Sequence, residues 1–190
     1  MLNPTARRFD LIAFDWDGTL FDSTAIITRC IQEAVRDVGG QVPSAERASY
    51  VIGMALIPAL AHAAPDVPPE RYKDLSARYR YHYTQHMHDI SLFEGVLDML
   101  HALKAKGAML TVATGNPLML HELMAACGVG PERTVMIGDT THDLEMAHLA
   151  GCASVGVSYG AHDHDEFERW KPLTVAHSVR ELHDWLVTNG

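Results

Sequence analysis

The sequence predicts an α/β fold in which helices cover a parallel β-sheet and a helical segment is inserted after the first strand. Short apolar runs typical of buried strands alternate with segments of helical spacing, which is the pattern of successive βα units. One long stretch, residues 23–91, has helical patterns alone and separates the first predicted strand from the second. The 190 residues are enough for one ordinary domain or for a core with a smaller insertion.

The N-terminal half begins with one strand and continues as helices. The apolar run at 9–14 is typical of a buried strand, and a helix that ends at the double glycine 39–40 is expected to follow. Residues 44–90 have helical spacing throughout. We expect Pro58 and the PDVPPE stretch at 65–70 to divide them into two or three helices.

The C-terminal half alternates between strands and helices. The expected strands lie at 109–113, 134–137 and 153–157, with a short one at Val175. The expected helices lie at 96–106, 117–127, 143–150 and 179–187. We therefore predict an α/β core made of residues 1–22 and 92–190, with residues 23–91 as a helical cap.

Composition and charge exclude several classes of protein. The chain is 47% hydrophobic and 21% charged, as is usual for a soluble globular protein. A net charge of −9 argues against broad nucleic-acid binding, which needs a basic face. No segment has the length and apolar character of a membrane span or a signal peptide, and the three cysteines are scattered, with no CxxC. We expect a cytoplasmic monomer or homodimer that binds neither nucleic acid nor membrane.

The stretch FDWDGTLFDS places two aspartates, Asp15 and Asp17, directly after the first strand. Taken alone, the pair could cap a helix or form a turn. Gly18 favours another interpretation, because a glycine lets the chain turn sharply and brings backbone N–H groups close to a bound anion. The two carboxylates would then face one pocket and repel each other. A Mg²⁺ ion between them would offset that repulsion, since Mg²⁺ binds one or two carboxylates together with water and phosphate oxygens.

Two further polar clusters follow later strands. Thr114-Gly115-Asn116 ends the second strand, where a hydroxyl and successive N–H groups before a helix can hold a phosphate; a plain helix N-cap is the simpler interpretation of this cluster alone. In GDTTHD, Asp143 could merely cap the next helix, whereas Asp139 stands at the end of a strand. Because the carboxyl ends of parallel strands meet at one edge of the sheet, we expect all three clusters in one site.

The three clusters together resemble the motifs of the haloacid dehalogenase superfamily of phosphohydrolases. FDWDGTLFDS, a strand that ends in TG, and MIGDTTHDLEMAHLAG follow its order, and the likeness is greatest to the phosphoglycolate phosphatase-like branch. The resemblance implies a Rossmann-like parallel sheet with a helical cap between the first and second motifs. It also implies a Mg²⁺-dependent hydrolase acting on a small phosphorylated metabolite, with 2-phosphoglycolate as a candidate.

The resemblance assigns a role to each acidic residue. Asp15 would be the nucleophile that forms an aspartyl-phosphate, and Asp17 would act as general acid and then as general base. The carboxylates of Asp15 and Asp139 and the backbone carbonyl of Asp17 would hold Mg²⁺, with Asp143 bound directly or through water. Thr114 and the N–H groups of Gly115 and Asn116 would hold the transferring phosphoryl group.

One motif of that superfamily is missing. Its members carry a lysine, usually followed by proline, that pairs with the nucleophile and the phosphate. Only 22 residues separate Asn116 from Asp139, and Arg133 is the first Lys or Arg among them. We therefore predict that one edge βα unit of about 30 residues, with the lysine, is absent.

Two explanations of this absence compete. Either the natural protein contains a segment that this sequence lacks, through omission or engineering, or the short form is natural; we favour the former. A genuine loss would leave the second strand at the edge of the sheet and the nucleophile without its cation. Lys104, Lys106 and Lys171 are the other cations considered, and we assign none of them to the site. The alternative functions are a catalytically impaired protein that binds Mg²⁺ or phosphate with little turnover, and a phosphomutase.

Three lesser features complete the sequence interpretation. HDHD at 162–165 could bind Zn²⁺ or Ni²⁺, although a solvated loop at the rim of the site is favoured. Gly53 falls where related caps present a substrate-specificity loop. The tyrosines of the helical piece that follows PDVPPE are too dense for a single core stripe, and we favour packing between cap helices over a lid that faces the cleft. These tyrosines are Tyr72, Tyr79, Tyr81 and Tyr83.

Overall fold

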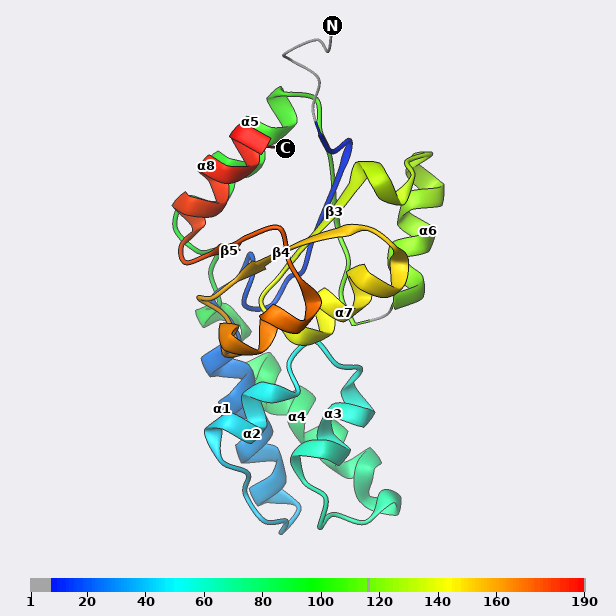
Figure 1. The fold of residues 1–190 in the computed structure, drawn as a ribbon. Coiled ribbons are helices and arrows are strands. Elements are labelled where there is room, and N and C mark those ends of the chain that lie inside the picture. The colour runs from blue at the N-terminus through cyan, green and yellow to red at the C-terminus, as the bar shows by residue number, and fades with distance from the viewer. Residues whose placement is uncertain (1–7, 116, 190) are drawn as a thin grey trace, which may run out of the picture.

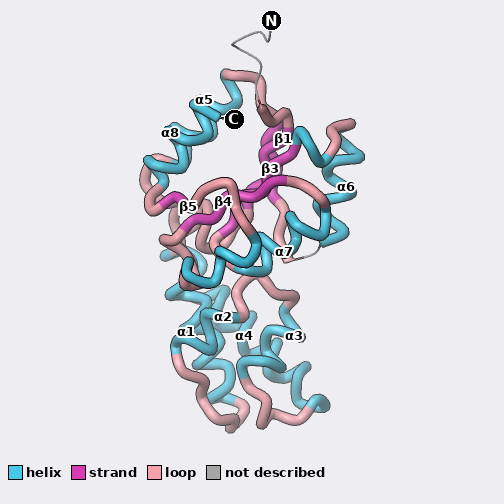
Figure 2. The backbone as a smooth tube through the Cα atoms, in the orientation of Figure 1, coloured by secondary structure: helices cyan, strands magenta, loops and turns pink. Residues whose placement is uncertain are grey.

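A five-stranded parallel sheet forms the centre of the molecule (Figures 1 and 2). The computed structural model describes residues 8–115 and 117–189. The strands are β1 (Leu11–Phe14), β2 (Met109–Val112), β3 (Thr134–Gly138), β4 (Ala153–Val157) and β5 (Val175–Ala176). Their order across the sheet is β2-β1-β3-β4-β5, and each neighbouring pair is parallel. The predicted α/β fold is confirmed.

The middle of the sheet is covered on both faces, which explains why its strands are continuous apolar runs. Ile12 and Phe14 point to one face, where α5 (Val96–Ala105) and α8 (Val179–Asn189) pack against them. Leu11 and Ala13 point to the other, where α6 (Pro117–Cys127) and α7 (Thr141–Ala150) lie. Figure 1 shows these two helical layers on either side of the strands.

Four helices lie beyond one end of the sheet (Figure 1). They are α1 (Thr24–Asp37), α2 (Ala45–Tyr50), α3 (Leu56–Ala63) and α4 (Tyr72–His86). We call this group the four-helix unit. It has a hydrophobic cluster of its own, which includes Ile31, Val35, Leu60 and Leu75. The remaining helical turns are η1 (Pro69–Arg71), η2 (Met87–Asp89), η3 (Pro131–Arg133) and η4 (His164–Trp170).

Three local expectations were wrong. Pro58 does not divide a helix but lies in the first turn of α3, where a proline needs no hydrogen-bond donor of its own. Helix α7 begins at Thr141 rather than at Asp143, because Thr140 supplies the N-cap. The turn η4 was not predicted at all, since its charged sequence has no helical apolar stripe.

Strand β2 lies at the edge of the sheet and pairs only with β1. Its first residue, Met109, is 39% exposed, whereas the four residues of β1 are all buried. This is the topology expected if one edge βα unit is absent from the chain. None of the helices in the described residues is both long and apolar enough to cross a lipid bilayer.

Candidate active site

Asp15 follows β1 directly and lies at the carboxyl end of the sheet, as predicted. Its side chain is 1% exposed, and neither carboxylate oxygen accepts a hydrogen bond of ordinary geometry within the described chain. Burial, then the nearby carboxylates of Asp143 and Asp139, raise its pKa well above the ordinary value, and the backbone of Trp16 offsets only part of this. Two unpartnered oxygens on a buried carboxylate are costly unless a ligand satisfies them.

Asp139 follows β3, which pairs with β1 so that Ile137 stands opposite Phe14. Thr19 donates its hydroxyl to Asp139 Oδ1 (2.9 Å), and the Ala161 N–H donates to Oδ2 (2.7 Å). Burial raises the pKa of Asp139 to about 6, although these two hydrogen bonds act in the opposite direction. The fold therefore fixes the orientation of this carboxylate.

Two glycines allow the backbone to approach Asp139. A Cβ atom on either Gly18 or Gly160 would overlap the Asp139 carboxylate. Gly18 also has a φ of +84°, which side chains rarely adopt. Both positions therefore need glycine because a side chain would not fit. Position 18 also needs it because of its positive φ.

Asp143 has two roles in the structure. It accepts hydrogen bonds from the backbone N–H (3.0 Å) and hydroxyl (2.7 Å) of Thr140, and so completes a capping box at the start of α7. It is also fully buried beside Asp139, and burial followed by that neighbouring charge raises its pKa to about 7. The helix-cap and ligand interpretations of Asp143 are thus compatible.

The three buried carboxylates form one cluster. Asp15, Asp139 and Asp143 each offer an oxygen, and these atoms lie within 4.8 Å of one another. An all-oxygen donor set with two unpartnered oxygens fits a hard divalent cation such as Mg²⁺. The structure therefore brings together Asp15, which follows the first strand, and Asp139 and Asp143, which follow the third, as the parallel sheet predicted.

Asp17 lies apart from this cluster and half-buried. Ser23 donates its hydroxyl to Asp17 Oδ1 (2.7 Å), and burial raises the Asp17 pKa against the opposite effect of that hydrogen bond. Its side chain lines a cavity of about 210 Å³ whose other walls come from the four-helix unit. Asp15 and Asp17 thus occupy different environments, although two residues apart.

Thr114 and Gly115, which belong to the polar cluster predicted after the second strand, lie at the same edge of the sheet as Asp15. The Ala113 N–H donates to the Phe14 carbonyl, so Thr114 and Gly115 follow β2 level with Asp15, and both are exposed. Asn116 lies outside the described residues. Gly18 requires a correction: its N–H donates to the Phe21 carbonyl (2.8 Å), so that donor is already engaged rather than directed at an anion.

A turn of the four-helix unit, residues 51–54, reaches the loops of the sheet. A Cβ on Gly53 would lie 3.2 Å from the Thr140 hydroxyl, and one on Gly115 would lie 3.4 Å from the Gly53 carbonyl. This turn separates the cavity beside Asp17 from a second cavity of about 370 Å³, which is lined by Gly115 and Asp143.

The HDHD stretch is only partly a solvated rim. Asp163, His164 and Asp165 are exposed, with donor atoms within 4.8 Å of one another, but His162 is only 7% exposed. His162 Nδ1 accepts from the Thr141 N–H (3.1 Å), so the proton is on Nε2, which donates to the Tyr50 carbonyl (2.8 Å). Its imidazole thus joins the site loops to the four-helix unit, and the expectation of a wholly solvated stretch was wrong.

The sequence interpretation missed the residues that orient the carboxylates. Thr19 and Ser23 were visible as hydroxyls inside FDWDGTLFDS, where every polar side chain was a candidate donor. Ala161 orients Asp139 through its backbone N–H, while His162 contacts the Tyr50 carbonyl and no carboxylate. No local sequence pattern marks such contacts.

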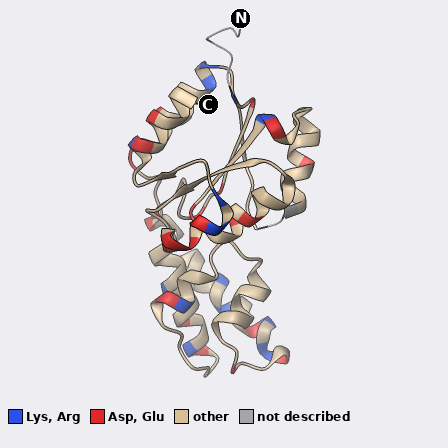
Figure 3. Cartoon of the chain, in the orientation of Figure 1, with Lys and Arg blue, Asp and Glu red and all other residues tan. Residues whose placement is uncertain are grey.

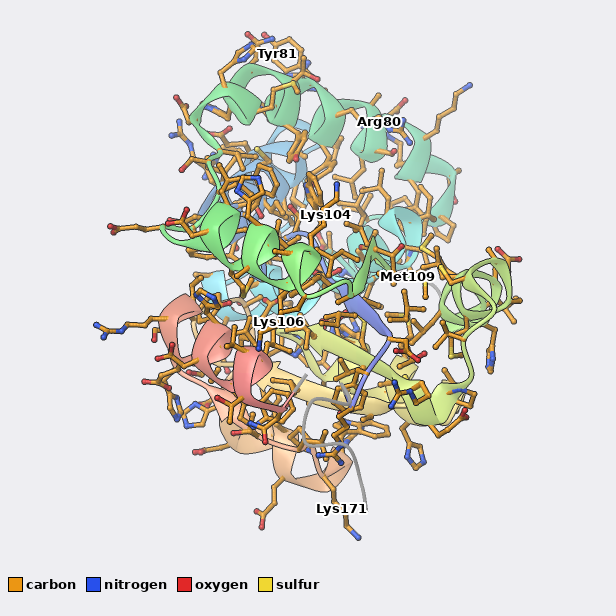
Figure 4. All side chains as sticks on the ribbon, turned by 90° about the horizontal axis from the view of Figure 1, so that it is seen from above. Arg80, Tyr81, Lys104, Lys106, Met109 and Lys171 are labelled. Atoms are coloured by element: carbon orange, nitrogen blue, oxygen red, sulfur yellow. The ribbon has the colours of Figure 1, made fainter. Side chains whose placement is uncertain are left out.

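The cations considered for the site lie elsewhere. Lys104 lies in the last turn of α5, and Lys106 donates to the Val187 carbonyl; both precede β2 at its amino end. Lys171 extends outward from the ribbon (Figure 4). In the view of Figure 3, the Lys and Arg residues of the described chain are spread over several elements. None of the five largest influences on the Asp15 pKa is a cationic side chain.

The fold and the site define an α/β protein that holds a cluster of buried carboxylates at the carboxyl end of its parallel sheet. A model of the haloacid dehalogenase-like hydrolase family matches residues 12–118, which is more than half of the chain. A second model, described as HAD-hydrolase-like, matches residues 112–182. The chain therefore belongs to the haloacid dehalogenase-like hydrolase family, and the resemblance seen in its motifs is confirmed.

Named relatives and solved structures agree with this assignment. The chain is 28% identical to a phosphoglycolate phosphatase of Aliivibrio fischeri over 213 residues, covering 90% of this chain and 94% of the relative. It is 27% identical to a 5′-nucleotidase of Pseudomonas aeruginosa over 222 residues, covering 96% and 100%. The crystal structure of a predicted phosphatase from Clostridium acetobutylicum has the same fold, with a TM-score of 0.83, 22% identity, and 94% and 98% of the two chains covered. Both alignments with relatives exceed the 190 residues of this chain, so each relative has residues without a counterpart here.

Proposed function

We propose that this chain is a Mg²⁺-dependent phosphomonoester hydrolase that forms an aspartyl-phosphate on Asp15. The observation that carries the proposal is the buried Asp15 carboxylate, which accepts no hydrogen bond of ordinary geometry from the residues that the structure describes and stands beside Asp139 and Asp143. Family membership and the phosphatase and nucleotidase names of relatives support the reaction class.

Asp15 and Asp17 divide the chemistry between them. One Asp15 oxygen attacks phosphorus and displaces the alcohol oxygen, which leaves the phosphoryl group on Asp15. Asp17 gives its proton to the departing alcohol and then takes a proton from the water that hydrolyses the intermediate. Burial raises the pKa of Asp17, and a higher pKa keeps more of this carboxyl protonated for the first step. Ser23 holds it in place through its hydrogen bond.

The oxygens of Asp15, Asp139 and Asp143, with the backbone carbonyl of Asp17, would hold Mg²⁺. Mg²⁺ at this position would neutralise charge on the transferring phosphoryl oxygens. Asp139 contributes a fixed orientation, because Thr19 and Ala161 already hold both of its oxygens in place. Thr114 and the Gly115 N–H would bind the phosphoryl group, and Asn116 keeps that role as a sequence prediction.

The four-helix unit would act as the cap. Its turn 51–54 already lies against Thr140 and Gly115, so it covers the end of the sheet where the carboxylates stand. A closed cap excludes water and limits the substrate to a small molecule. The cavity of about 210 Å³ beside Asp17 has the size for the alcohol part of such a molecule. 2-Phosphoglycolate is the substrate for which a relative is named, and it serves below as the reference ester.

Hydrolysis of p-nitrophenyl phosphate tests the proposal. We expect activity that requires Mg²⁺, and we expect Asp15→Asn to lower it by about 10⁴-fold because the nucleophile is lost. Asp163→Asn, at an exposed acidic residue outside the cluster, is the matched control and should keep full activity. Equal activity of Asp15→Asn and the unchanged protein would refute the proposed mechanism.

A second candidate is a protein of this family that binds Mg²⁺ or phosphate but turns over poorly. It is favoured by one observation: the lysine of the family motif is missing from the sequence, and no cationic side chain is among the main causes of the shifted Asp15 pKa. Calorimetric binding of Mg²⁺ and inorganic phosphate, with no p-nitrophenol release, is the result expected for this candidate. Turnover of p-nitrophenyl phosphate at the usual rate of a phosphatase would exclude it.

A further inference from the structure

The cavity beside Asp17 is lined mostly by apolar side chains, together with Asp17, Tyr79 and the backbone of the turn 51–54. It has a volume of about 210 Å³ and lies among α1, α3, α4 and the turn 51–54. Ile27 and Ile31 of α1, Leu60 of α3 and Tyr79 of α4 are among its lining residues. None of the described residues that line it is Lys, Arg or His, and Asp17 is the single acidic one.

The cavity lies where the alcohol part of the substrate must extend. Asp17 protonates the leaving oxygen under the proposed mechanism, so the carbon attached to that oxygen lies next to Asp17. The larger cavity on the other side of the turn has Asp143 among its walls but not Asp17. The alcohol part is therefore directed toward the apolar cavity, between helices of the four-helix unit.

We propose that this site selects phosphomonoesters with a small, apolar and uncharged alcohol part, and that the side chains of Ile27, Ile31 and Leu60 determine this selectivity. The inference rests on the proposed function, since it takes Asp17 as the acid. A second anionic group, such as a carboxylate, would lose water among mostly apolar side chains with no cation to pair with it. An alkyl group would instead lose contact with water against the same walls.

Tyr79 does not change this conclusion. Burial raises the pKa of its phenol, so the ring stays uncharged in the physiological range. Its hydroxyl can donate one hydrogen bond to a substrate oxygen but supplies no counter-charge. A neutral hydroxyl or ether in the alcohol part is therefore compatible with the cavity, and a carboxylate is not.

Two esters of matched shape separate charge from size. Isobutyl phosphate has the same branching and number of non-hydrogen atoms in its alcohol part as 2-phosphoglycolate, but lacks the carboxylate. With Mg²⁺ present we expect kcat/KM to be at least about tenfold higher for isobutyl phosphate, because an unpaired buried charge costs more than this factor. Equal values, or a preference for 2-phosphoglycolate, would overturn the inference while leaving the proposed function intact.

Substitutions in the cavity wall test the named residues. Ile31→Ala should lower kcat/KM for isobutyl phosphate by about fourfold or more, since each buried methylene lost is worth about that factor. Ile57→Ala is the matched control, because Ile57 lies on α3, is 45% exposed and does not line the cavity. Ile31→Lys should reverse the preference, so that 2-phosphoglycolate is hydrolysed with the higher kcat/KM. If Ile31→Lys does not fold, Ile31→Ala still tests the assignment. A fall of equal size in Ile57→Ala, or unchanged kinetics in Ile31→Ala, would contradict the assignment.

A protein without turnover is tested by binding. The two esters are compared by calorimetry in the presence of Mg²⁺, and isobutyl phosphate should bind about tenfold more tightly. Absence of turnover with this order of binding would refute the proposed hydrolysis but support the apolar cavity. Tighter binding of 2-phosphoglycolate, or no binding of either ester, would overturn the inference.

Discussion

Asp15 and Asp139 are buried carboxylates at the ends of neighbouring strands, but their surroundings differ. Asp139 accepts hydrogen bonds from Thr19 and Ala161 on its two oxygens, and two glycines leave it room. Asp15 accepts none of ordinary geometry. The fold thus completes the coordination of one carboxylate by itself and leaves the other to be completed by a ligand.

This difference shows how the chain distributes order and strain. A carboxylate held by two donors can orient a metal with little rearrangement, which is the use of a supporting shell around a site. An unpartnered buried carboxylate destabilises the folded protein, and such a cost is common where a protein keeps a group reactive. Stability of the metal-free protein should therefore report on this cluster.

The largest effect expected is a fall in the stability of the metal-free protein as pH rises. The folded-state pKa of Asp139 is raised to about 6 and that of Asp143 to about 7, whereas both are near 4 in an unfolded chain. The folded state therefore binds more protons between these values. The stability that these groups contribute is fully present below about pH 4 and is lost as pH rises through 6 and 7.

Urea unfolding at pH 5, 6, 7 and 8 measures this loss, with EDTA in one series and excess Mg²⁺ in the other. At about 1.4 kcal/mol for each unit of pKa shift, the difference between the two series should grow by a few kcal/mol from pH 5 to pH 8. His162, whose pKa is lowered by burial, acts in the opposite direction in both series and cancels in the difference. If the difference in the free energy of unfolding between the two series did not change with pH, the buried carboxylates would not be the source of the destabilisation.

Gly160→Ala should break the arrangement around Asp139. The added Cβ overlaps the Asp139 carboxylate, so we expect a loss of about 1–3 kcal/mol in the free energy of unfolding and weaker Mg²⁺ binding. Gly39→Ala is the control, because no atom lies within 4 Å of a Cβ there and only backbone strain is added at its φ of +75°. Denaturation and Mg²⁺ titration calorimetry give the two quantities. Unchanged Mg²⁺ affinity in Gly160→Ala would mean that Asp139 tolerates displacement.

Thr19→Val should give the smallest effect and sharpen the comparison. The substitution keeps the shape of the side chain and removes one hydrogen bond to Asp139, worth about 1.5 kcal/mol at the lower end of the range for a charged acceptor. Mg²⁺ affinity should fall several-fold in calorimetry, because the carboxylate is less firmly oriented. Thr19→Ser, which retains the hydroxyl, should restore most of the affinity. Failure of Thr19→Ser to exceed Thr19→Val would point to packing rather than to the hydrogen bond.

Sequence alone predicted the sheet and the acidic residues because both follow from local patterns. An apolar run followed at once by Asp15 marks a strand end, and the parallel sheet then places Asp139 beside it. The donors that orient Asp139 were out of reach, since Thr19 lies 120 residues away and Ala161 acts through its backbone. Sequence could not decide whether Asp143 caps a helix or binds a metal. Its one carboxylate accepts the capping hydrogen bond from Thr140 and also faces Asp15 and Asp139, so both interpretations fit.

Hydrogen exchange should show a consequence of the position of β2. Strand β2 has four residues and one neighbour, so half of its backbone groups are not held by another strand. Opening of this short ladder costs less than opening of β1 or β3, which are paired on both sides. Thr114 and Gly115 continue from β2, so the proposed phosphate-binding side of the site should exchange faster with the edge of the sheet, while the carboxylate cluster should keep the protection of the central strands.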